Sequence, residues 1–433
     1  MAMMLEEQFI YRPECEKLTA DEINCLQEKL LRCQLEWCKK NSPYYSKVLA
    51  DVDTGSFRLS ELGSLPFTCK SSVSEDPDAF ICVPGRDIGE VVFTSGTTGT
   101  PCKIVYSNND MQRLRYNEQR SFTAAGVNAD DIVLLTCTGD RCFIAGMAYY
   151  LGARSVGAAA VRNGLNSIDS HLDILRTLRP TVIVGVPSFL KHLGEAASRA
   201  GLCGSVRKLM CIGEPVRDRE FKLAGLGRQI ADLWGAEVHS TYASSEIVSS
   251  FCECEAFNGG HLLPDLVIPE IVDEEGNVLP YGEVGELVLT QLNAQAMPLI
   301  RFRTGDISFL VNEPCRCGRA SLRLGPILGR KSQLLKCKGT SIYPQGIYNI
   351  LSTFAGVEDF YMEVSGEDLS DRIDIFAALA DEQVELSELE RLLRAHCRMS
   401  VPVHIVPAQQ VRARVFGTSR KPVRFFDLRK KSI

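Results

Sequence analysis

The sequence has little of what marks a membrane protein or a nucleic-acid-binding protein. None of its apolar runs reaches the roughly 20 residues needed to cross a bilayer. Its first residues, Met-Ala-Met-Met-Leu-Glu-Glu, lack the character of a secretion signal. Positive charge is not in excess either, because 48 basic and 54 acidic residues give a net charge of −6. That charge argues against nucleic acid or a membrane as a partner. These absences predict a cytoplasmic protein.

Cysteine, in contrast, is abundant, with 17 in 433 residues. Without a secretion signal, these residues are expected to be reduced thiols, with a metal site among them. Cys315 and Cys317 form one close pair, and Cys252 and Cys254 are followed by His261. Thiolate and imidazole ligands in two such groups suit a closed structural Zn²⁺ site. We expect Cys254, His261, Cys315 and Cys317 to be the ligands. Cys252 replaces Cys254 if its strand faces the other way, and buried free thiols are the alternative to any metal.

Strand-like and helix-like segments alternate through the first half of the chain. Buried strands are expected at residues 132–136, 181–186, 208–212 and 238–242. Helices are expected at residues 168–178 and 188–200. Such alternation predicts an α/β fold with a mostly parallel sheet covered by helices on both faces. Near the N-terminus, Thr19 and Glu22 form a capping-box pattern that begins a further helix, which should end before the stretch 41–43, Asn-Ser-Pro.

The pattern changes in the second half. From about residue 269, short segments separated by Gly/Asn turns predict a small β subdomain that includes strands at 286–290 and 307–311. Beyond residue 330 an independent α+β pattern begins. We therefore expect a large N-terminal domain over residues 1–330 and a small mobile α+β C-terminal domain over residues 331–433.

The stretch 91–101, Val-Val-Phe-Thr-Ser-Gly-Thr-Thr-Gly-Thr-Pro, is the most specific local signal. Three apolar residues suited to a buried strand lead into a loop of hydroxyl groups and glycine. Free backbone N–H groups, small side chains and hydroxyls can surround a phosphate. It is not the common nucleotide loop, because no Gly-Lys-Ser/Thr follows at the required spacing.

Three of the expected strands run directly into unusual residues. These are 185–187 (Gly-Val-Pro), 213–215 (Gly-Glu-Pro) and 242–246 (Tyr-Ala-Ser-Ser-Glu). Ligands of open α/β sheets bind outside the carboxyl ends of the strands. Because the loop after residue 93 also follows a strand, we expect four segments to line one crevice.

The order Thr-Ser-Gly-Thr-Thr-Gly-x-Pro resembles the phosphate loop of the adenylate-forming (AMP-binding) enzymes, which include acyl- and aryl-CoA ligases, luciferases and peptide-synthetase adenylation domains. Residues 242–246 resemble the family's aromatic-Gly-x-Ser/Thr-Glu motif, with Ala243 in place of glycine. Residues 301–306, Arg-Phe-Arg-Thr-Gly-Asp, resemble its aromatic-x-Thr-Gly-Asp motif. Other stretches, including 41–46 and 315–319, resemble the phenylacetate-CoA ligase subfamily in particular.

The resemblance implies a site for ATP and Mg²⁺. Tyr242 would stack near the adenine, and Glu246 would hold Mg²⁺ on the phosphates. Asp306 would accept hydrogen bonds from the ribose hydroxyls, which Arg330 also approaches. The residues that it assigns to ATP or AMP are Thr94, Ser95, Gly96, Thr97, Thr98, Gly99, Gly213, Glu214, Pro215, Ser240, Thr241, Tyr242, Ala243, Ser244, Ser245, Asp306 and Arg330.

The resemblance also assigns roles in the C-terminal part. Lys421 matches the lysine that stabilises charge while a carboxylate attacks the α-phosphorus of ATP. After rotation of the small domain, the loop at Lys338 and Gly339 would approach coenzyme A. Ser332 stands where the family usually has Asp or Lys at the hinge.

The implied reaction joins a carboxylic acid to coenzyme A. Phe143, Ala145, Gly146 and Tyr242 are expected to form an apolar slot for the acid, which predicts a phenylacetate-like aryl acid. Two alternatives stay open: an adenylating enzyme that loads a carrier protein, and a non-enzymatic zinc-containing interaction protein. A homodimer is compatible with each of these readings.

Overall fold

The computed structural model describes residues 9–94, 102–140, 142–337, 340–366, 371–380, 385–397, 400–417 and 423–429. Contacts within the chain divide it into two compact units. Unit 1 consists of Met1–Lys222, Gln229–Thr304 and Ser308–Ile327. Unit 2 consists of Leu223–Arg228, Gly305–Ile307 and Leu328–Ile433.

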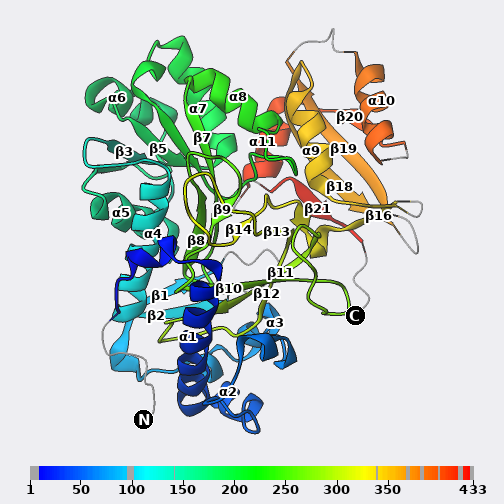
Figure 1. Ribbon diagram of the computed structural model, residues 1–433. Coiled ribbons are helices and arrows are strands. Elements are labelled where there is room, and N and C mark those ends of the chain that lie inside the picture. The colour runs from blue at the N-terminus through cyan, green and yellow to red at the C-terminus, as the bar shows by residue number, and fades with distance from the viewer. Residues whose placement is uncertain are drawn as a thin grey trace. The chain divides into compact units, whose positions relative to one another are not determined.

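The centre of unit 1 is a nine-stranded sheet with the order β13-β14-β9-β8-β7-β6-β5-β3-β4 (Figure 1). Neighbouring strands are parallel from β7 to β4 and antiparallel from β7 to β13. The parallel strands are β3 (Ile132–Leu135), β4 (Ala159–Arg162), β5 (Val182–Gly185), β6 (Lys208–Cys211) and β7 (Glu237–Ser244). The antiparallel ones are β8 (Ser249–Glu253), β9 (Gly260–His261), β13 (Leu310–Val311) and β14 (Arg323–Leu324).

The expected parallel sheet is thus confirmed. The sequence pattern did not reveal β4, because this edge strand is only partly buried and has no continuous buried run.

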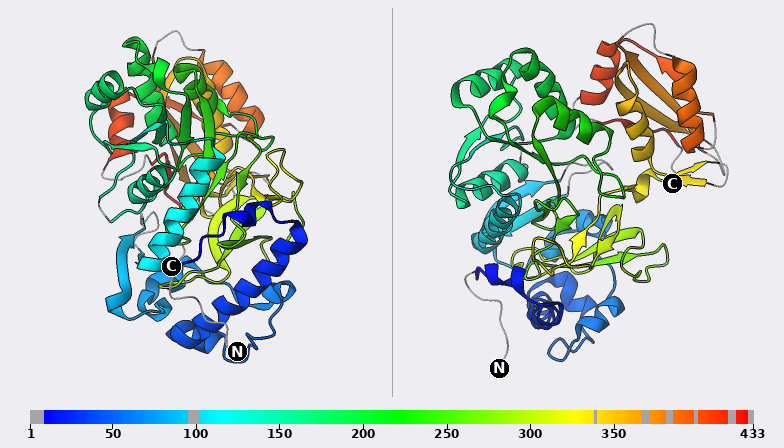
Figure 2. Two further views of the ribbon diagram at one scale, coloured as in Figure 1. Left: turned by 60° about the vertical axis from the view of Figure 1, so that its left-hand side comes forward. Right: turned by 45° about the horizontal axis from the view of Figure 1, so that its top comes forward.

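Helices cover both faces of this sheet, and their bounds follow from local signals. The helices of unit 1 include α1 (Ala20–Asn41), α2 (Pro43–Val48), α3 (Lys70–Glu75), α4 (Asn108–Ala124), α5 (Ala145–Ser155), α6 (Ile168–Leu178) and α7 (Pro187–Arg199). A further helix, α8, spans Gly225–Trp234. Thr19 and Glu22 form the expected capping box at the start of α1, which ends at Asn41, one residue later than expected. The long helix α4 packs against α5 and β8 and is the cyan helix of Figure 2, left.

The strand before the phosphate loop differs from expectation. β1 (Ile88–Phe93) pairs with β2 (Lys103–Ser107) in a separate antiparallel hairpin, not in the nine-stranded sheet. Val92 is buried, but Val91 and Phe93 are exposed. The prediction of a buried strand was therefore wrong. A run of three apolar residues does not distinguish a strand inside a sheet from a hairpin strand with one face exposed to solvent. The carboxyl-edge argument also does not apply to this loop.

A second sheet contains the strands of the β subdomain, in the order β10-β11-β12-β15. Their bounds are β10 (Val267–Val272), β11 (Gly285–Gln291), β12 (Phe302–Ser308) and β15 (Gly329–Arg330). The strand expected at 307–311 is two elements, because β12 ends at Ser308 and β13 pairs with β14 of the large sheet.

Unit 2 contains a four-stranded sheet with the order β20-β19-β18-β21. Its elements are β16 (Leu335–Cys337), β17 (Thr340–Ile342), α9 (Pro344–Thr353), β18 (Val357–Ser365), β19 (Arg372–Leu379), α10 (Leu386–Cys397), β20 (Val403–Ile405), α11 (Ala408–Phe416) and β21 (Phe425–Asp427). Alternate residues of β18 enter two cores: Phe360 and Met362 pack with α9 and α10, whereas Tyr361 packs with α11. This is the expected α+β pattern.

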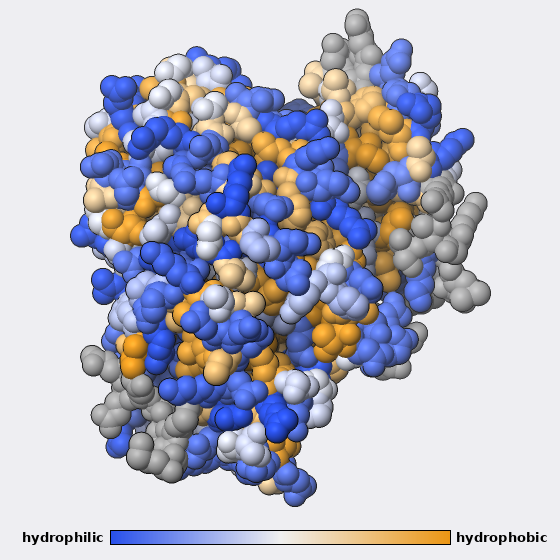
Figure 3. Space-filling model, in the orientation of Figure 1, coloured by the Kyte–Doolittle hydropathy of each residue, from blue (hydrophilic) through white to orange (hydrophobic). Residues whose placement is uncertain are grey.

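Among the described residues, no helix is both long and apolar enough to span a bilayer. On the face seen in Figure 3, hydrophilic side chains predominate, and hydrophobic ones are scattered between them.

Candidate functional site

Three of the expected segments leave the large sheet at one edge. β5 ends at Gly185, directly before α7, and β6 ends at Cys211, shortly before Gly213. The register pairs Gly185 with Cys211 and Cys211 with Ser240 of β7. Gly213 has a φ of 77°, a conformation that glycine adopts without steric cost. The structure therefore brings residues 185–187, 213–215 and 242–246 to the same side of the sheet.

The side chain of Glu214 is occupied by the neighbouring helix α7. Its oxygens accept hydrogen bonds from the Ser188 backbone N–H at 2.8 Å and from the Ser188 hydroxyl at 3.1 Å. The first N–H groups of a helix have no acceptor within the helix, so Glu214 caps α7. This tether holds the 213–215 loop beside the start of the helix.

Tyr242 lies on the hairpin formed by β7 and β8. It is paired with Phe251, and the two rings stack with centroids 5.7 Å apart and planes 12° apart. The neighbouring Thr241 hydroxyl donates to the Cys211 carbonyl at 2.8 Å, which links this hairpin to β6. The half-buried Tyr242 ring is thus held by a second ring, as suits a contact for a planar base.

Glu246 is buried beside a cation that sequence reasoning did not assign. Lys70 Nζ, at the start of α3, lies 2.9 Å from one carboxylate oxygen, and the Ser244 hydroxyl donates to the other at 2.6 Å. Burial alone would raise the pKa of Glu246, but Lys70 and Ser244 hold it below its ordinary value. Glu246 is therefore an ionised carboxylate, the ligand type that Mg²⁺ prefers.

The phosphate loop itself, residues 95–101, lies outside the described residues, but both of its ends are described. The Thr94 N–H donates to the Cys102 carbonyl at 3.0 Å, and the Cys102 N–H donates to the Thr94 hydroxyl at 3.3 Å. Thr94 is buried. Thr94 therefore holds the two ends of the loop together.

In unit 2, Asp306 and Arg330 lie opposite each other on β12 and β15. Arg330 Nε donates to Asp306 Oδ1 at 3.2 Å. The preceding Gly305 has a φ of 76°, so the glycine of the Thr-Gly-Asp motif meets a backbone requirement. The residues expected in the C-terminal part for catalysis and coenzyme A, Lys338, Gly339 and Lys421, lie outside the described residues.

The expected acyl-slot residues lie at the start of α5. Phe143 and Ala145 are half-buried, and Gly146 is buried. A Cβ atom on Gly146 would lie 2.3 Å from the Thr138 carbonyl oxygen, and the Gly146 N–H donates to that same carbonyl at 3.1 Å. Gly146 is thus needed for close packing of α5 on the segment after β3.

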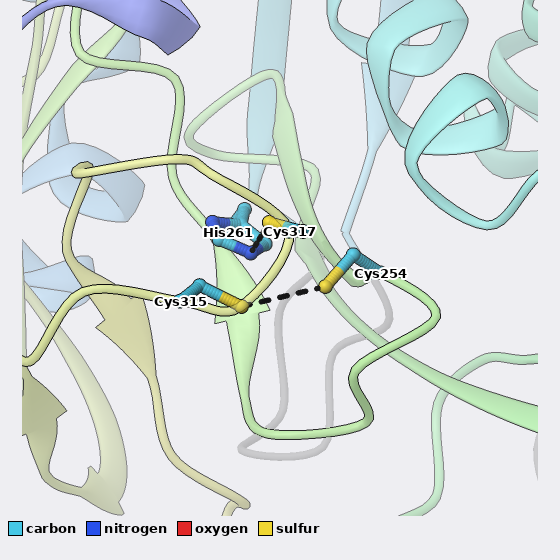
Figure 4. Close-up of side chains that lie close together, drawn as sticks. All are labelled: Cys254, His261, Cys315 and Cys317. Atoms are coloured by element: carbon cyan, nitrogen blue, oxygen red, sulfur yellow. Dashed lines mark hydrogen bonds between the residues drawn. The ribbon is translucent and has the colours of Figure 1, made fainter.

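The four selected metal ligands converge, as Figure 4 shows for Cys254, His261, Cys315 and Cys317. Their ligand atoms all lie within 4.8 Å of one another. The sulfur atoms of Cys254 and Cys315 are 3.7 Å apart, and Cys317 Sγ is 3.4 Å from His261 Nε2. Zn–S bonds of about 2.3 Å in a tetrahedron place two sulfur atoms about 3.8 Å apart. The donor set and its spacing therefore fit Zn²⁺.

Of the two candidate cysteines, Cys252 lies on β8 and Cys254 follows the end of that strand. Cys252 pairs with Thr241 and is buried in the helix-covered core with Val133 and Val184. Cys254 faces the cluster instead. Two residues that are two positions apart on a regular strand point to the same side, but β8 ends at Glu253, so Cys254 does not follow the strand and its side chain turns away from that of Cys252. The substitute ligand Cys252 is therefore excluded.

The charge states of the cluster are consistent with metal binding. Burial, together with Arg319 and Arg323, lowers the pKa of His261 to about 3, which keeps the imidazole neutral and able to ligate. Burial raises the pKa of Cys254 to about 12, so a bound cation is needed to make its thiol a thiolate.

Comparison with known proteins places the chain in a family. The model of the AMP-binding enzyme family matches residues 34–295. The phenylacetate-coenzyme A ligase of Thermus thermophilus is 32% identical over 363 residues, which is 82% of this chain and 81% of that protein. That of Pseudomonas putida is 27% identical, over 94% of this chain and 93% of that protein.

A solved structure of 2-hydroxyisobutyryl-CoA ligase, in complex with R3-HIB-AMP, has the same fold. Its TM-score is 0.84 at 20% identity, and the match covers 96% of this chain and 91% of that one. The family match and these relatives together show that the chain belongs to the AMP-binding enzyme family.

Sequence reasoning missed Lys70, whose ammonium group pairs with Glu246. A basic residue beside an acidic one gives a signal only when the two are near in sequence. These partners are far apart along the chain, so only the tertiary structure reveals them.

Proposed function

We propose that the protein is an ATP-dependent ligase that joins an aryl acid of the phenylacetate type to coenzyme A. The observation that carries this proposal is the similarity to phenylacetate-coenzyme A ligases over most of the chain, at 26–32% identity. In the first step an oxygen of the acid attacks the α-phosphorus of ATP, and pyrophosphate leaves. In the second step the thiolate of coenzyme A attacks the acyl carbon, and AMP leaves.

The phosphates are bound by the loop of residues 95–99, with Thr94 fixing its base. Glu246 holds Mg²⁺, which supplies positive charge against the phosphate oxygens. Lys70 neutralises Glu246 before the nucleotide arrives, so the buried carboxylate does not pay an unpaired desolvation cost. Tyr242 contacts the adenine, and the backbone of residues 213–215 follows its edge.

Residues later in the chain have the remaining roles. Asp306, oriented by Arg330, accepts hydrogen bonds from the two ribose hydroxyls. Lys421 stabilises the charge that develops at the α-phosphate during adenylation. Lys338 and Gly339 serve coenzyme A in the second step. Phe143, Ala145, Gly146 and Tyr242 surround the ring of the acid.

Pyrophosphate release tests this function. Aryl and aliphatic acids are compared, each with and without coenzyme A, and the acyl-CoA product is measured. We expect release with aryl acids and thioester formation with free coenzyme A. Adenylation that yields no thioester with free coenzyme A would favour the carrier-loading alternative. Absence of any acid-dependent pyrophosphate release would favour a non-enzymatic protein.

Lys421→Ala separates the two half-reactions. We expect adenylation to fall about 10²- to 10³-fold, because a charge-stabilising donor is lost, while thioester formation from supplied acyl-adenylate persists. Arg412→Ala, which removes an exposed partner of Glu358, is the control and should leave both unchanged. Equal loss of both half-reactions in Lys421→Ala would contradict its assignment.

We also propose that Cys254, His261, Cys315 and Cys317 hold one structural Zn²⁺. Four protein ligands leave no open position for a substrate. The bound ion joins two segments that are distant in sequence, and at a free concentration 100-fold above its Kd it adds about 2.7 kcal/mol of stability.

Elemental analysis of protein prepared without chelator should find about one zinc per chain. Cys315→Ser and Cys317→Ser should lower both metal content and melting temperature, whereas Cys25→Ser, at an exposed thiol, should change neither. Absence of zinc from the wild-type protein would refute the site.

A further inference from the structure

A buried ion pair lies between the two segments of unit 1 that are assigned to the nucleotide. Arg217 Nε lies 2.7 Å from the Glu253 carboxylate, and the two side chains are only 6% and 2% exposed. Removing both charges from water is costly, and such pairs often contribute little net stability. A pair of this kind therefore calls for an explanation other than stability.

Arg217 follows the 213–215 loop and fastens the segment that contains it. Its Nη2 donates to the Val238 carbonyl of β7 at 2.8 Å, and its Nη1 donates to the Phe221 carbonyl at 3.1 Å. Its guanidinium also lies 5.1 Å from the centre of the Phe257 ring. All three groups of contacts are directional, so the planar guanidinium fixes the loop relative to β7.

Glu253 fastens β7 from the other side. Its Oε2 accepts a hydrogen bond from the Ser240 backbone N–H at 2.9 Å. The β7–β8 ladder extends only to the pair Thr241 and Cys252, so the carboxylate replaces the next backbone partner. The Ser240 amide is consequently not available to a nucleotide, although Ser240 was expected among the ATP contacts.

We propose that Arg217 and Glu253 are positioning residues for the adenosine part of ATP, an inference that rests on the proposed function. The pair links the segment after Gly213 to the strand that carries Tyr242, two residues beyond Ser240. It touches neither the reacting atoms nor, in this role, the nucleotide. It sets the distance between the 213–215 loop and the end of β7, and nucleotide binding depends on both of these segments.

Nucleotide affinity tests the proposal. AMP binding is measured by calorimetry for the wild type and for Glu253→Gln, and the KM for ATP is measured by pyrophosphate release. A neutral glutamine cannot balance the charge of Arg217 while also accepting the hydrogen bond of the Ser240 N–H. The 213–215 loop and the end of β7 should therefore move apart. We expect the Kd for AMP to rise about tenfold, since small displacements of binding groups are costly. Arg217→Lys keeps the charge but loses the planar fork, and it should show a smaller rise.

A second buried pair of the same residue types supplies the control. Arg301 and Glu270 lie 3.0 Å apart with side chains 2% and 8% exposed, and Arg301 donates to the Gly63 and Leu65 carbonyls. Glu270→Gln should lower the melting temperature in the same way and leave the Kd for AMP unchanged.

The outcomes are separable. Wild-type affinity for AMP in folded Glu253→Gln and Arg217→Lys would overturn the positioning role while leaving the proposed function intact. An equal loss of affinity in Glu270→Gln would also overturn it, because general loosening would then explain the effect. If Glu253→Gln does not fold, Arg217→Lys decides. A wild-type protein that neither binds AMP nor releases pyrophosphate would refute the proposed function and the positioning role together.

Discussion

Two buried glutamates are associated with the strand β8, and their hydrogen-bonding and ionic partners differ. Glu253 faces the guanidinium of Arg217 and the Ser240 N–H. Glu118, on α4, accepts hydrogen bonds from the Ser250 hydroxyl at 2.7 Å and the Asn117 amide at 3.2 Å. Its second oxygen has no hydrogen-bond partner among the described residues.

Burial raises the pKa of both glutamates, and they differ in the partners that act against this rise. Burial raises the pKa of Glu253, but Arg217 and the Ser240 N–H oppose that rise. Burial raises the pKa of Glu118 to about 7, and only neutral donors, Ser250 and Asn117, act against it. One buried glutamate therefore forms an ion pair with a guanidinium, whereas the other has only neutral donors and takes up a proton near neutral pH. Burial alone does not decide which role a carboxyl takes; its partners do.

The largest effect is expected from breaking the ion pair of Arg217 and Glu253. Arg217→Met leaves the Glu253 carboxylate buried without a counter-charge, and we expect a loss of about 3–5 kcal/mol in the free energy of unfolding. Urea unfolding at pH 7.5 measures it. The double variant Arg217→Met/Glu253→Gln should recover part of the loss, and a double variant as unstable as the single one would contradict this account.

Replacing Glu118, the glutamate with only neutral donors, should have the opposite effect on the free energy of unfolding. The folded state binds a proton on Glu118 more tightly than the unfolded state, so its contribution to stability is full below pH 4.5 and declines as pH rises to about 7. Glu118→Gln removes this titration. We expect the variant to exceed the wild type by about 3 kcal/mol at pH 8 and to match it near pH 4.5. Parallel pH profiles of urea unfolding for the two proteins would rule this out.

A partly accessible carboxylate extends the comparison to ligand binding. The side chain of Asp306 is 13% exposed and pairs with Arg330. Asp306→Ala should weaken AMP binding by about 1.5–3 kcal/mol, since a charge-assisted hydrogen bond to the ribose is lost. Asp359, whose side chain is 14% exposed and paired with Arg424 in the same unit, is the matched control. Unchanged AMP affinity by calorimetry would remove Asp306 from the site.

The smallest effect concerns the neutral donors. Ser250→Ala removes the hydroxyl that donates to Glu118, and should cost about 1 kcal/mol at pH 8 while moving the Glu118 titration to higher pH. The Ser249 hydroxyl is buried without a hydrogen-bond partner among the described residues, so Ser249→Ala should cost less. A larger loss for Ser249→Ala than for Ser250→Ala would show that volume, not hydrogen bonding, controls this region.

The sequence by itself predicted the features that depend on neighbours along the chain. The capping box of Thr19 and Glu22 began α1, and continuous apolar runs predicted β3, β5, β6 and β7. Glycine-rich turns at the carboxyl ends of these strands indicated the edge at which the candidate site lies. The spacing of Cys315 and Cys317, with Cys254 and His261, was sufficient to select a cluster whose ligand atoms do converge.

Tertiary structure alone decided the features that depend on distant partners. It turned Cys252 into the core and Cys254 toward His261, Cys315 and Cys317, because β8 ends at Glu253 and Cys254 no longer follows the alternation of that strand. It placed β1 in a separate hairpin with one exposed face. It also brought Lys70 to Glu246 and Arg217 to Glu253. A buried charge is stable only beside its counter-charge, and the fold, not the local sequence, supplies that neighbour.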